Sequence, residues 1–264
     1  MEEAKVALSV AIAAHNEENN LSRCLASVSG WVAEIVVVDS ASSDRTAAIA
    51  RQYTSKVIPS DNPPIFHLNK QKALDACRQS WILQLDADEV ITAQLHEEIS
   101  VIVNKGTFGD QFNGYYIPRK NYFLGGWLRK GGQYPDYIIR LFRRGKGRFP
   151  SKSVHEQIEI RGPVGYLKHP LLHYPFPNLA AYWKKAGRYT DLIVFELKSS
   201  HTPLNFGILV NYIIVKPFIS FVNLYFRHLG IIDGWRGFLF ALLSAMQHPI
   251  AFIKYAKNYG KTLD

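Results

Sequence analysis

Four short apolar runs alternate with helix-like stretches over the first 90 residues, and this alternation constrains the fold more than any other feature. The runs are Ala7–Ala14, Glu34–Asp39, Lys56–Pro59 and Trp81–Leu85. A β-α-β alternation of this kind predicts a mostly parallel sheet that is wrapped by helices. In such sheets, ligands bind beyond the carboxyl ends of the strands.

The segments between these runs have helical spacing of apolar residues. Leu21, Cys24, Leu25 and Val28 would lie on one face of a first helix, which we expect Asn20 to cap. Ser42 or Ser43 is expected to cap the second helix. Two more helices are predicted, at Asn69–Arg78 and from about Thr92 to Asn104.

Two of the predicted strands end in carboxylates, at Asp39 and at the Asp86-Ala87-Asp88 segment. If that segment is extended, the side chains of Asp86 and Asp88 point the same way. Neighbouring carboxylates repel each other unless a cation lies between them. A hard divalent ion such as Mg²⁺ or Mn²⁺, shared with diphosphate oxygens, fits this pattern. The alternative is a surface turn with an acid at each end.

The charge is divided unevenly along the 264 residues. The first 100 residues contain 8 Lys and Arg against 14 Asp and Glu, whereas residues 101–264 contain 23 against 8. This asymmetry suggests two kinds of partner, with the basic part facing anionic lipid, nucleic acid or a phosphorylated substrate. The two cysteines, Cys24 and Cys77, are expected to be reduced core residues.

The C-terminal part is unusually apolar and aromatic. Lys216 is the only formal charge between Pro203 and Phe226, and Phe238–Ile253 is similarly apolar. Flanking basic residues and dense aromatic residues favour contact with a membrane interface. A helical cap on the catalytic core and a true membrane span remain as alternatives. The N-terminus has no pattern of a secretory signal, so we expect a cytosolic location.

Three stretches together resemble the inverting family-2 glycosyltransferases, which have the GT-A fold. They are VAIAAHNEENNLSRCLASV (Val10–Val28), EIVVVDSASSDRT (Glu34–Thr46) and KQKALDACRQSWILQLDADEV (Lys70–Val90). Further stretches resemble the lipopolysaccharide-core β-1,4-glucosyltransferase branch of that family. They are NGYYIPRKN (Asn113–Asn121), GGWLRKGGQYPDYIIRLFRR (Gly125–Arg144), Val154-His155-Glu156 and Leu171-Leu172-His173-Tyr174.

The resemblance implies a set of donor-binding residues. His15 and Glu17 would line the nucleotide pocket, although the family more often has Tyr in place of His15. Asp39 would accept a hydrogen bond from the imide N–H of the base, with capping of the next helix as its alternative role. Lys70 matches a position where the family usually has Arg. Asp86 would contact the ribose or a metal-bound water. Asp88 would bind Mg²⁺ or Mn²⁺ directly, with Asp86 and His173 as further metal ligands.

Inverting transfer also needs a general base on the acceptor side. The resemblance implies Glu156 for this role, at the end of Val154-His155-Glu156, and Asp136 is the competing candidate. Asp136 follows Gly131 and Gly132, which would let the backbone approach the donor sugar or would form a plain turn. One of three arginines is expected to hold a phosphate. They are Arg140, Arg143 and Arg144, and the sequence does not say which one faces the site.

The combined prediction is a GT-A catalytic domain over residues 1–200, Rossmann-like with a mostly parallel sheet, and a helical, membrane-facing extension over 201–264. We expect a metal-dependent hexosyltransferase that uses a nucleotide sugar, such as a UDP-hexose. Its acceptor would be a lipid-linked glycan such as lipopolysaccharide core, at the cytosolic face of the membrane. Alternative acceptors are polyprenyl phosphate and another polysaccharide.

Two alternative functions are disfavoured. A sugar nucleotidyltransferase usually needs a glycine-rich loop after the first strand, and Ala13–Asn20 contains no glycine. A basic nucleic-acid-binding module would explain the positive part of the chain. The acidic strand ends and the apolar C-terminal segments argue against such a module, and we expect no nucleic-acid partner.

Overall fold

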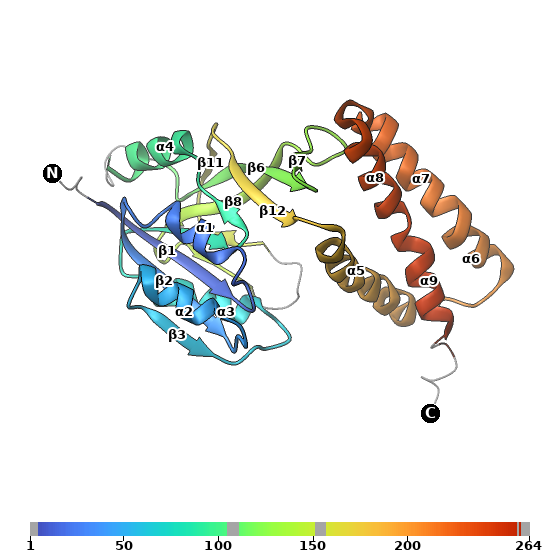
Figure 1. The fold of residues 1–264 in the computed structure, drawn as a ribbon, viewed down its shortest axis with the longest axis horizontal. Coiled ribbons are helices and arrows are strands. Elements are labelled where there is room, and N and C mark those ends of the chain that lie inside the picture. Colours follow the sequence, from blue (N-terminus) through green and yellow to red (C-terminus); the bar gives the residue numbers. More distant parts are fainter. Residues whose placement is uncertain (1–4, 105–110, 151–156, 258, 260–264) are drawn as a thin grey trace. The chain divides into compact units, whose positions relative to one another are not determined.

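A computed structural model describes residues 5–104, 111–150, 157–257 and 259 of the chain (Figure 1). These residues form two compact units. Of the described residues, those up to 119 and those in 137–173 form the first unit, and those in 120–136 and from 174 onward form the second. The predicted Glu156 lies outside the described residues.

The first unit is built on a mostly parallel run of four strands. They are β1 (Val6–Ala14), β2 (Val32–Ser40), β3 (Val57–Ser60) and β4 (Trp81–Asp86). β1 pairs in parallel with both β2 and β4, and β2 pairs in parallel with β3. The predicted parallel arrangement is therefore confirmed for all four apolar runs.

Shorter strands extend this sheet in the order β3-β2-β1-β4-β8-β6-β12-β5. β8 is antiparallel to β4, and β12 is antiparallel to β5, so the sheet is mixed beyond β4. β7 and β11 each pair with β6, whereas β9 and β10 form a separate two-stranded sheet. The bounds of these strands are β5 (Glu89–Val90), β6 (Gly114–Phe123), β7 (Gly126–Trp127), β8 (Asp136–Arg143), β9 (Gly147–Arg148), β10 (Glu159–Ile160), β11 (Val164–Tyr166) and β12 (Leu171–Phe176).

Helices cover both faces of the sheet. α1 (Leu21–Ala26), α2 (Thr46–Tyr53) and α4 (Ala93–Asn104) contribute to a core with Val10, Ile12 and Leu83, whereas α3 (His67–Asp75) packs on the other face with Ala11, Val36 and Ile82. Alternate residues of β1 enter opposite cores, which is the two-residue period of a strand covered on both faces. Cys24 and Cys77 are buried, unpaired thiols, as predicted, and burial raises the pKa of Cys77 to about 12.

The predicted helix caps are confirmed only in part. Asn20 stands at the N-cap position of α1, as predicted, but its side chain makes no capping hydrogen bond. At α2, neither Ser42 nor Ser43 is the cap. Instead, Asp44 Oδ1 accepts from the backbone N–H of Thr46 at 2.9 Å. The aspartate lies two residues before that N–H, which is the reach of an Asx turn.

The second unit is mainly helical. The long helix α5 (Leu179–Ser199) begins at Asn178, whose side chain accepts from the N–H of Ala181. A first apolar helical stretch follows, made of α6 (Phe206–Val210), η1 (Asn211–Val215), α7 (Lys216–Val222) and η2 (Asn223–Arg227). The turn η3 (Gly230–Asp233) leads into α8 (Gly234–Ala245) and α9 (Gln247–Lys257). Figure 1 shows α8 and α9 running back beside α7 and α6.

Two stretches of this unit are long and apolar enough to cross a membrane, judged by length and composition. They are Phe206–Arg227, with a mean hydropathy of 1.6, and Gly230–Lys257, with a mean hydropathy of 1.3. In an apolar window of 18 residues within each stretch, 6% of the first and 28% of the second is buried. We call the two stretches together the helix pair. Its large apolar side chains therefore lie mostly on the outside.

Truncation of the sheet core tests this packing. Leu83 on β4 is fully buried, so Leu83→Ala is expected to reduce the free energy of unfolding by about 2–5 kcal/mol, because a cavity adds to the lost transfer energy. Val101 on α4 is 54% exposed, and Val101→Ala should change the same quantity by less than about 0.5 kcal/mol. Urea denaturation followed by circular dichroism measures both. Equal losses in the two variants would contradict the assigned core.

Candidate functional site

The parallel register brings the predicted donor residues to one edge of the sheet. Ala14 at the end of β1 is paired with Asp39 on β2, and Ala13 is paired with Asp86 on β4. The segment from His15 onward, Asp39 and Asp86 therefore leave the sheet at neighbouring carboxyl ends. This is the edge at which open α/β sheets bind ligands.

The loops after β1 and β2 are tied to each other. Asn16 has a left-handed backbone with φ 55°, and its Oδ1 accepts from the N–H of Ser43 at 2.8 Å. The N–H of Glu17 donates to Thr46 Oγ1 at 2.8 Å, and Glu17 Oε2 accepts from the Asn20 side chain. His15 Nδ1 lies 2.7 Å from the carbonyl oxygen of Ser40. These bonds fix His15 and Glu17 beside the end of β2.

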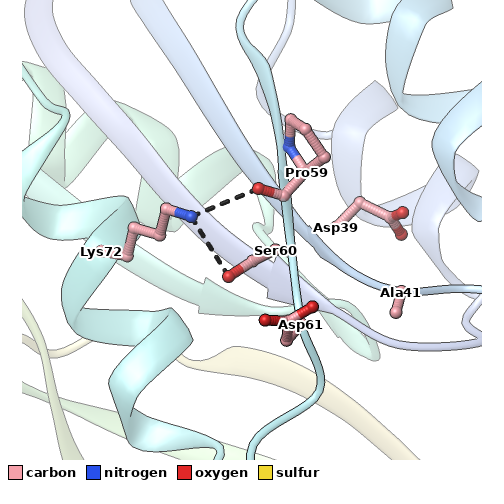
Figure 2. A pocket seen from close by; sticks show the side chains of 6 residues that line it. All are labelled: Asp39, Ala41, Pro59, Ser60, Asp61 and Lys72. Carbon is pink, nitrogen blue, oxygen red and sulfur yellow. Dashed lines mark hydrogen bonds between the residues drawn. The ribbon is translucent and has the colours of Figure 1, made fainter.

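Asp39 lines a pocket of about 450 Å³ next to the ends of β2 and β3. Figure 2 shows it with Ala41, Pro59, Ser60, Asp61 and Lys72, and Lys72 Nζ donates to Pro59 O and Ser60 Oγ. Asp39 is 9% exposed, and its Oδ1 has no hydrogen-bond partner among the described residues. A buried acceptor without a donor is costly, so this oxygen is suited to receive an N–H from a ligand. Because Asp44 supplies the α2 cap, the capping alternative for Asp39 has no support.

Asp86 is held by two cations. Its Oδ1 forms an ion pair with Lys70 Nζ, and its Oδ2 lies 2.6 Å from Arg140 Nη2. Burial alone would raise the pKa of the Asp86 carboxyl, but the charges of Arg140 and Lys70 outweigh burial and hold this pKa well below its usual range. Asp86 is therefore a carboxylate at neutral pH, and the predicted Lys70 lies at the site.

Glu89 and Arg119 complete this network, and sequence reasoning did not assign a role to either. Glu89 is fully buried, and its Oε1 accepts from Arg140 at 2.8 Å and faces Arg119 at 3.4 Å. Its other oxygen accepts the backbone N–H of Asp86 at 2.9 Å. The signal in the sequence was a third acid directly after the Asp86-Ala87-Asp88 segment.

Of the three candidate arginines, Arg140 is the one beside the acidic strand end. It is buried, donates to Gln84 as well as to the two carboxylates, and has its pKa raised by Asp86 and Glu89 against the opposing effect of burial. Arg143 instead stacks over the ring of Trp81, with 4.6 Å from its guanidinium carbon to the ring centroid. Arg144 makes a backbone bond to Ser80.

The Asp86-Ala87-Asp88 segment is a turn rather than an extended strand. β4 ends at Asp86, and Ala87 and Asp88 turn the chain into β5. The expectation that the two carboxylates point the same way is therefore wrong. Asp86 faces Lys70 and Arg140, whereas Asp88 Oδ2 lies 3.5 Å from His173 Nε2. The antiparallel pairing of His173 with Glu89 brings β12 to this turn.

Asp88 and His173 form a pair that fits a divalent metal. Their side chains are 11% and 14% exposed, which leaves a small opening toward solvent or a ligand. No group of three or more His, Cys, Asp or Glu side chains gathers as a metal cage in the part of the chain that the structure describes. Mg²⁺ sites with one or two protein carboxylates and substrate phosphates are common, so the two side chains suit a metal that a phosphate ligand helps to bind.

Asp136, the described candidate for the base, belongs to the second unit. Its Oδ2 accepts from the side-chain amide of Asn121 at 3.0 Å, and the same amide donates to the carbonyl oxygen of Gln133 at 3.1 Å. Gly131 and Gly132 both have positive φ, at 64° and 72°, so the turn before Asp136 requires a conformation that favours glycine.

Comparison with known proteins identifies the family. Residues 9–159 match the model described as glycosyl transferase family 2. The chain is 33% identical to the lipopolysaccharide core biosynthesis glycosyltransferase LpsC of Rhizobium meliloti (strain 1021), over 97% of this chain and 93% of that protein. It is 38% identical to an uncharacterized glycosyltransferase of Rickettsia felis, over 97% and 91% of the two chains.

Among solved structures, the S. aureus TarS fragment 1–349 in complex with UDP-GlcNAc is similar, with a TM-score of 0.47 and 15% identity over 91% of this chain and 81% of that chain. The family match covers more than half of the chain, and LpsC aligns along almost its whole length. The predicted GT-A fold class and enzyme class are thereby confirmed. The chain belongs to glycosyltransferase family 2.

Proposed function

We propose that this glycosyltransferase binds a uridine-diphosphate hexose, with the base beside Asp39. The observation that supports the proposal is Asp39, which lines the pocket at the end of β2 and whose buried Oδ1 lacks a donor among the described residues. An ionised carboxylate only accepts hydrogen bonds, and uracil offers an imide N–H donor. His15 and Glu17 lie on the loop bonded to this strand end and would flank the nucleoside.

Mg²⁺ or Mn²⁺ is proposed to bind at Asp88 and His173. The ion would supply Lewis-acid stabilisation of the charge that develops on the departing diphosphate. Lys70 and Arg140 hold Asp86 ionised beside it, so Asp86 stays available as an acceptor for the ribose or for water. The lack of a larger acidic cage among the described side chains agrees with a metal that binds together with the donor.

The proposed reaction inverts the anomeric centre. A carboxylate on the acceptor side takes the proton from the acceptor hydroxyl while its oxygen bonds to the anomeric carbon, and the bond from that carbon to the diphosphate oxygen breaks. Glu156 remains the first candidate for this base, and Asp136 the second. Asn121 orients the Asp136 carboxylate through its amide N–H.

The acceptor is proposed to be a lipid-linked glycan of the lipopolysaccharide-core type. The near full-length similarity to LpsC supports this choice, and polyprenyl phosphate or another polysaccharide remains the alternative. We place the enzyme at the cytosolic face of the membrane, attached through the helices from residue 201 onward. Residues 202–257 contain five Lys or Arg and one acid, which suits an anionic lipid surface.

Interfacial attachment fits the exposure of the helix pair better than a core-covering cap. Phe206 and Phe218 are 81% and 66% exposed, and Trp235 is 58% exposed beside Arg236. Contiguous apolar exposure of this kind marks an interaction surface. Aromatic side chains next to basic ones are typical of the lipid headgroup region.

Loss of the Asp39 carboxylate should weaken nucleotide binding. Asp39→Ala removes a charged acceptor worth about 1.5–3 kcal/mol, so UDP should bind roughly 10–150-fold more weakly. Isothermal titration with UDP and Mn²⁺ measures the change. Asp75→Ala removes an exposed acid that accepts from the Gln71 side chain and serves as the control. Equal UDP affinity in wild type and Asp39→Ala would refute the assigned base contact.

Loss of the Asp88 carboxylate should remove the metal dependence. In wild type, Mn²⁺ is expected to strengthen UDP binding, and EDTA to stop transfer. Asp88→Ala should make UDP binding insensitive to Mn²⁺ and lower turnover by at least roughly a hundredfold, since metal stabilisation of the transition state is worth several kcal/mol. Full activity in Asp88→Ala would contradict the metal site.

Two exposed phenylalanines test membrane attachment. Each ring that leaves water contributes about 1.5–3 kcal/mol, so the double variant Phe206→Ser with Phe218→Ser should detach the full-length protein from vesicles of phosphatidylethanolamine and phosphatidylglycerol in a flotation assay. Phe195 on α5 is equally exposed, at 68%, but lies outside the helix pair, and Phe195→Ser should still float. Co-flotation of the double variant with the vesicles at wild-type levels would show that Phe206 and Phe218 do not form the membrane-binding surface.

A further inference from the structure

The turn of the helix pair holds the segment that leads to Asp136. Asp233, in η3, accepts two backbone hydrogen bonds from that segment. Its Oδ1 lies 2.9 Å from the N of Arg129, and its Oδ2 lies 2.9 Å from the N of Lys130. A carboxylate that accepts two neighbouring N–H groups forms charge-assisted bonds with a defined direction. Asp233 lies about a hundred positions after Arg129 and Lys130 in the sequence, so these bonds join two distant segments of the chain.

Two further bonds join the same partners. The N–H of Gly131 donates to the carbonyl oxygen of His228 at 2.8 Å, and Arg236 Nε donates to the carbonyl oxygen of Leu124 at 3.2 Å. Gly126 leaves room for the Arg236 side chain, because a Cβ there would lie 2.5 Å from Arg236 Nε. The segment from Leu124 to Gly131 is therefore bonded at four places to residues 228–236, which comprise η3 and its flanks.

The turn itself is shaped by close backbone contacts. A Cβ at Gly237 would lie 1.9 Å from the carbonyl oxygen of Gly230, and a Cβ at Gly230 would lie 2.6 Å from that of Leu224. Neither clash is relieved by moving a side chain, because both neighbours are backbone. Leu229 and Gly234 on either side of η3 have φ of 59° and 60°. The turn thus presents Asp233 from a rigid and specific backbone.

Asp233 is also the only acid between residues 202 and 257. It stands at the N-terminus of α8 but makes no capping bond to that helix with its side chain. A carboxylate in an apolar and basic stretch opposes the attraction to an anionic surface. Its bonds to the backbone N–H groups of Arg129 and Lys130 instead hold the segment that precedes Asp136.

We propose that Asp233 is a positioning residue that fixes the acceptor-side segment Trp127–Asp136 to the membrane-binding helix pair. The inference rests on the proposed function, because it takes the helix pair to be the part that meets the lipid. Binding of the helix pair to a membrane would then order the segment that ends at Asp136. Asn121 holds the same segment at its other end, through bonds to Gln133 and Asp136. Transfer would be favoured where the lipid-linked acceptor is present.

Hydrogen exchange on the full-length protein tests this coupling. Asp233→Asn keeps the shape of the side chain but leaves only one acceptor oxygen. Its NH₂ group is a donor, so it cannot accept the second backbone N–H. In wild type, phosphatidylglycerol-containing vesicles should slow exchange of the amides of residues 129–131 at least tenfold. In Asp233→Asn, these amides should exchange at least tenfold faster and should no longer respond to vesicles, although flotation and UDP affinity are unchanged.

Asp191→Asn is the matched control. Asp191 pairs with Lys254 at 2.7 Å in the same unit and is exposed, so its variant should keep the response to vesicles. With rough lipopolysaccharide as acceptor and the UDP-hexose that wild type turns over, Asp233→Asn should lower kcat at least tenfold with little change in the KM for the donor. If Asp233→Asn does not fold, Arg236→Gln, which removes the guanidinium bond to Leu124 and the contact with the Trp235 ring, should reduce the vesicle response while flotation is retained.

The outcomes separate this inference from the proposed function. Absence of turnover in wild type would count against the proposed reaction, and the exchange experiment would still decide the role of Asp233. Vesicle-bound wild type with unchanged exchange at 129–131 would overturn the inference. So would an Asp233→Asn variant that retains the wild-type response. A purely structural role would speed exchange but leave the vesicle response in place.

Discussion

The ion pairs of Arg140 are the interaction on which the site depends. Its guanidinium lies between Asp86 and Glu89 and also donates to Gln84, so it binds two acids near one strand end and helps to hold the pKa of the Asp86 carboxyl well below its usual range. Removing the cation would leave Asp86 with Lys70 alone and Glu89 with Arg119 at 3.4 Å, and the loss of a charge partner inside a buried network is more costly than breaking a surface pair. Because Asp86 and Glu89 bracket the turn that carries Asp88, the same cation also fixes the residue that faces His173.

The parallel half of the fold was predictable because its signals are local. β1, β2 and β4 are continuous apolar runs, and burial on both faces requires that composition. The later strands were not assigned individually, since most are short, and their pairing joins distant segments, as in β12 with β5. The cap of α2 could not be predicted because several neighbouring side chains there can accept an N–H. In the structure Asp44 accepts from Thr46, and the N–H of Ser43 is bonded to the distant Asn16.

The site was only partly predictable. Asp39, Asp88, His173 and Lys70 were predicted as site residues. Asp39 lies near the end of β2 and Asp88 in the turn after β4, whereas His173 lies on β12 facing Asp88 and Lys70 lies on α3 facing Asp86. The choice of Arg140 over Arg143 depends on strand β8, which buries the side chain of Arg140 beside Asp86 and stacks that of Arg143 on Trp81. The turn at Asp88 could not be read from spacing, because two residues after a strand fit a turn as well as an extension.

The close backbone contacts of the turn in the helix pair give it a sequence signature. Gly230, Asp233, Gly234 and Gly237 form the pattern Gly-x-x-Asp-Gly-x-x-Gly. Gly237 cannot gain a Cβ because of the Gly230 carbonyl, and Gly234 has a positive φ. A related glycosyltransferase that has this pattern after an apolar helix can build the same turn, and one with a larger residue at the last glycine cannot. Genome sequences alone would thus divide such enzymes into those that carry the turn and those that do not.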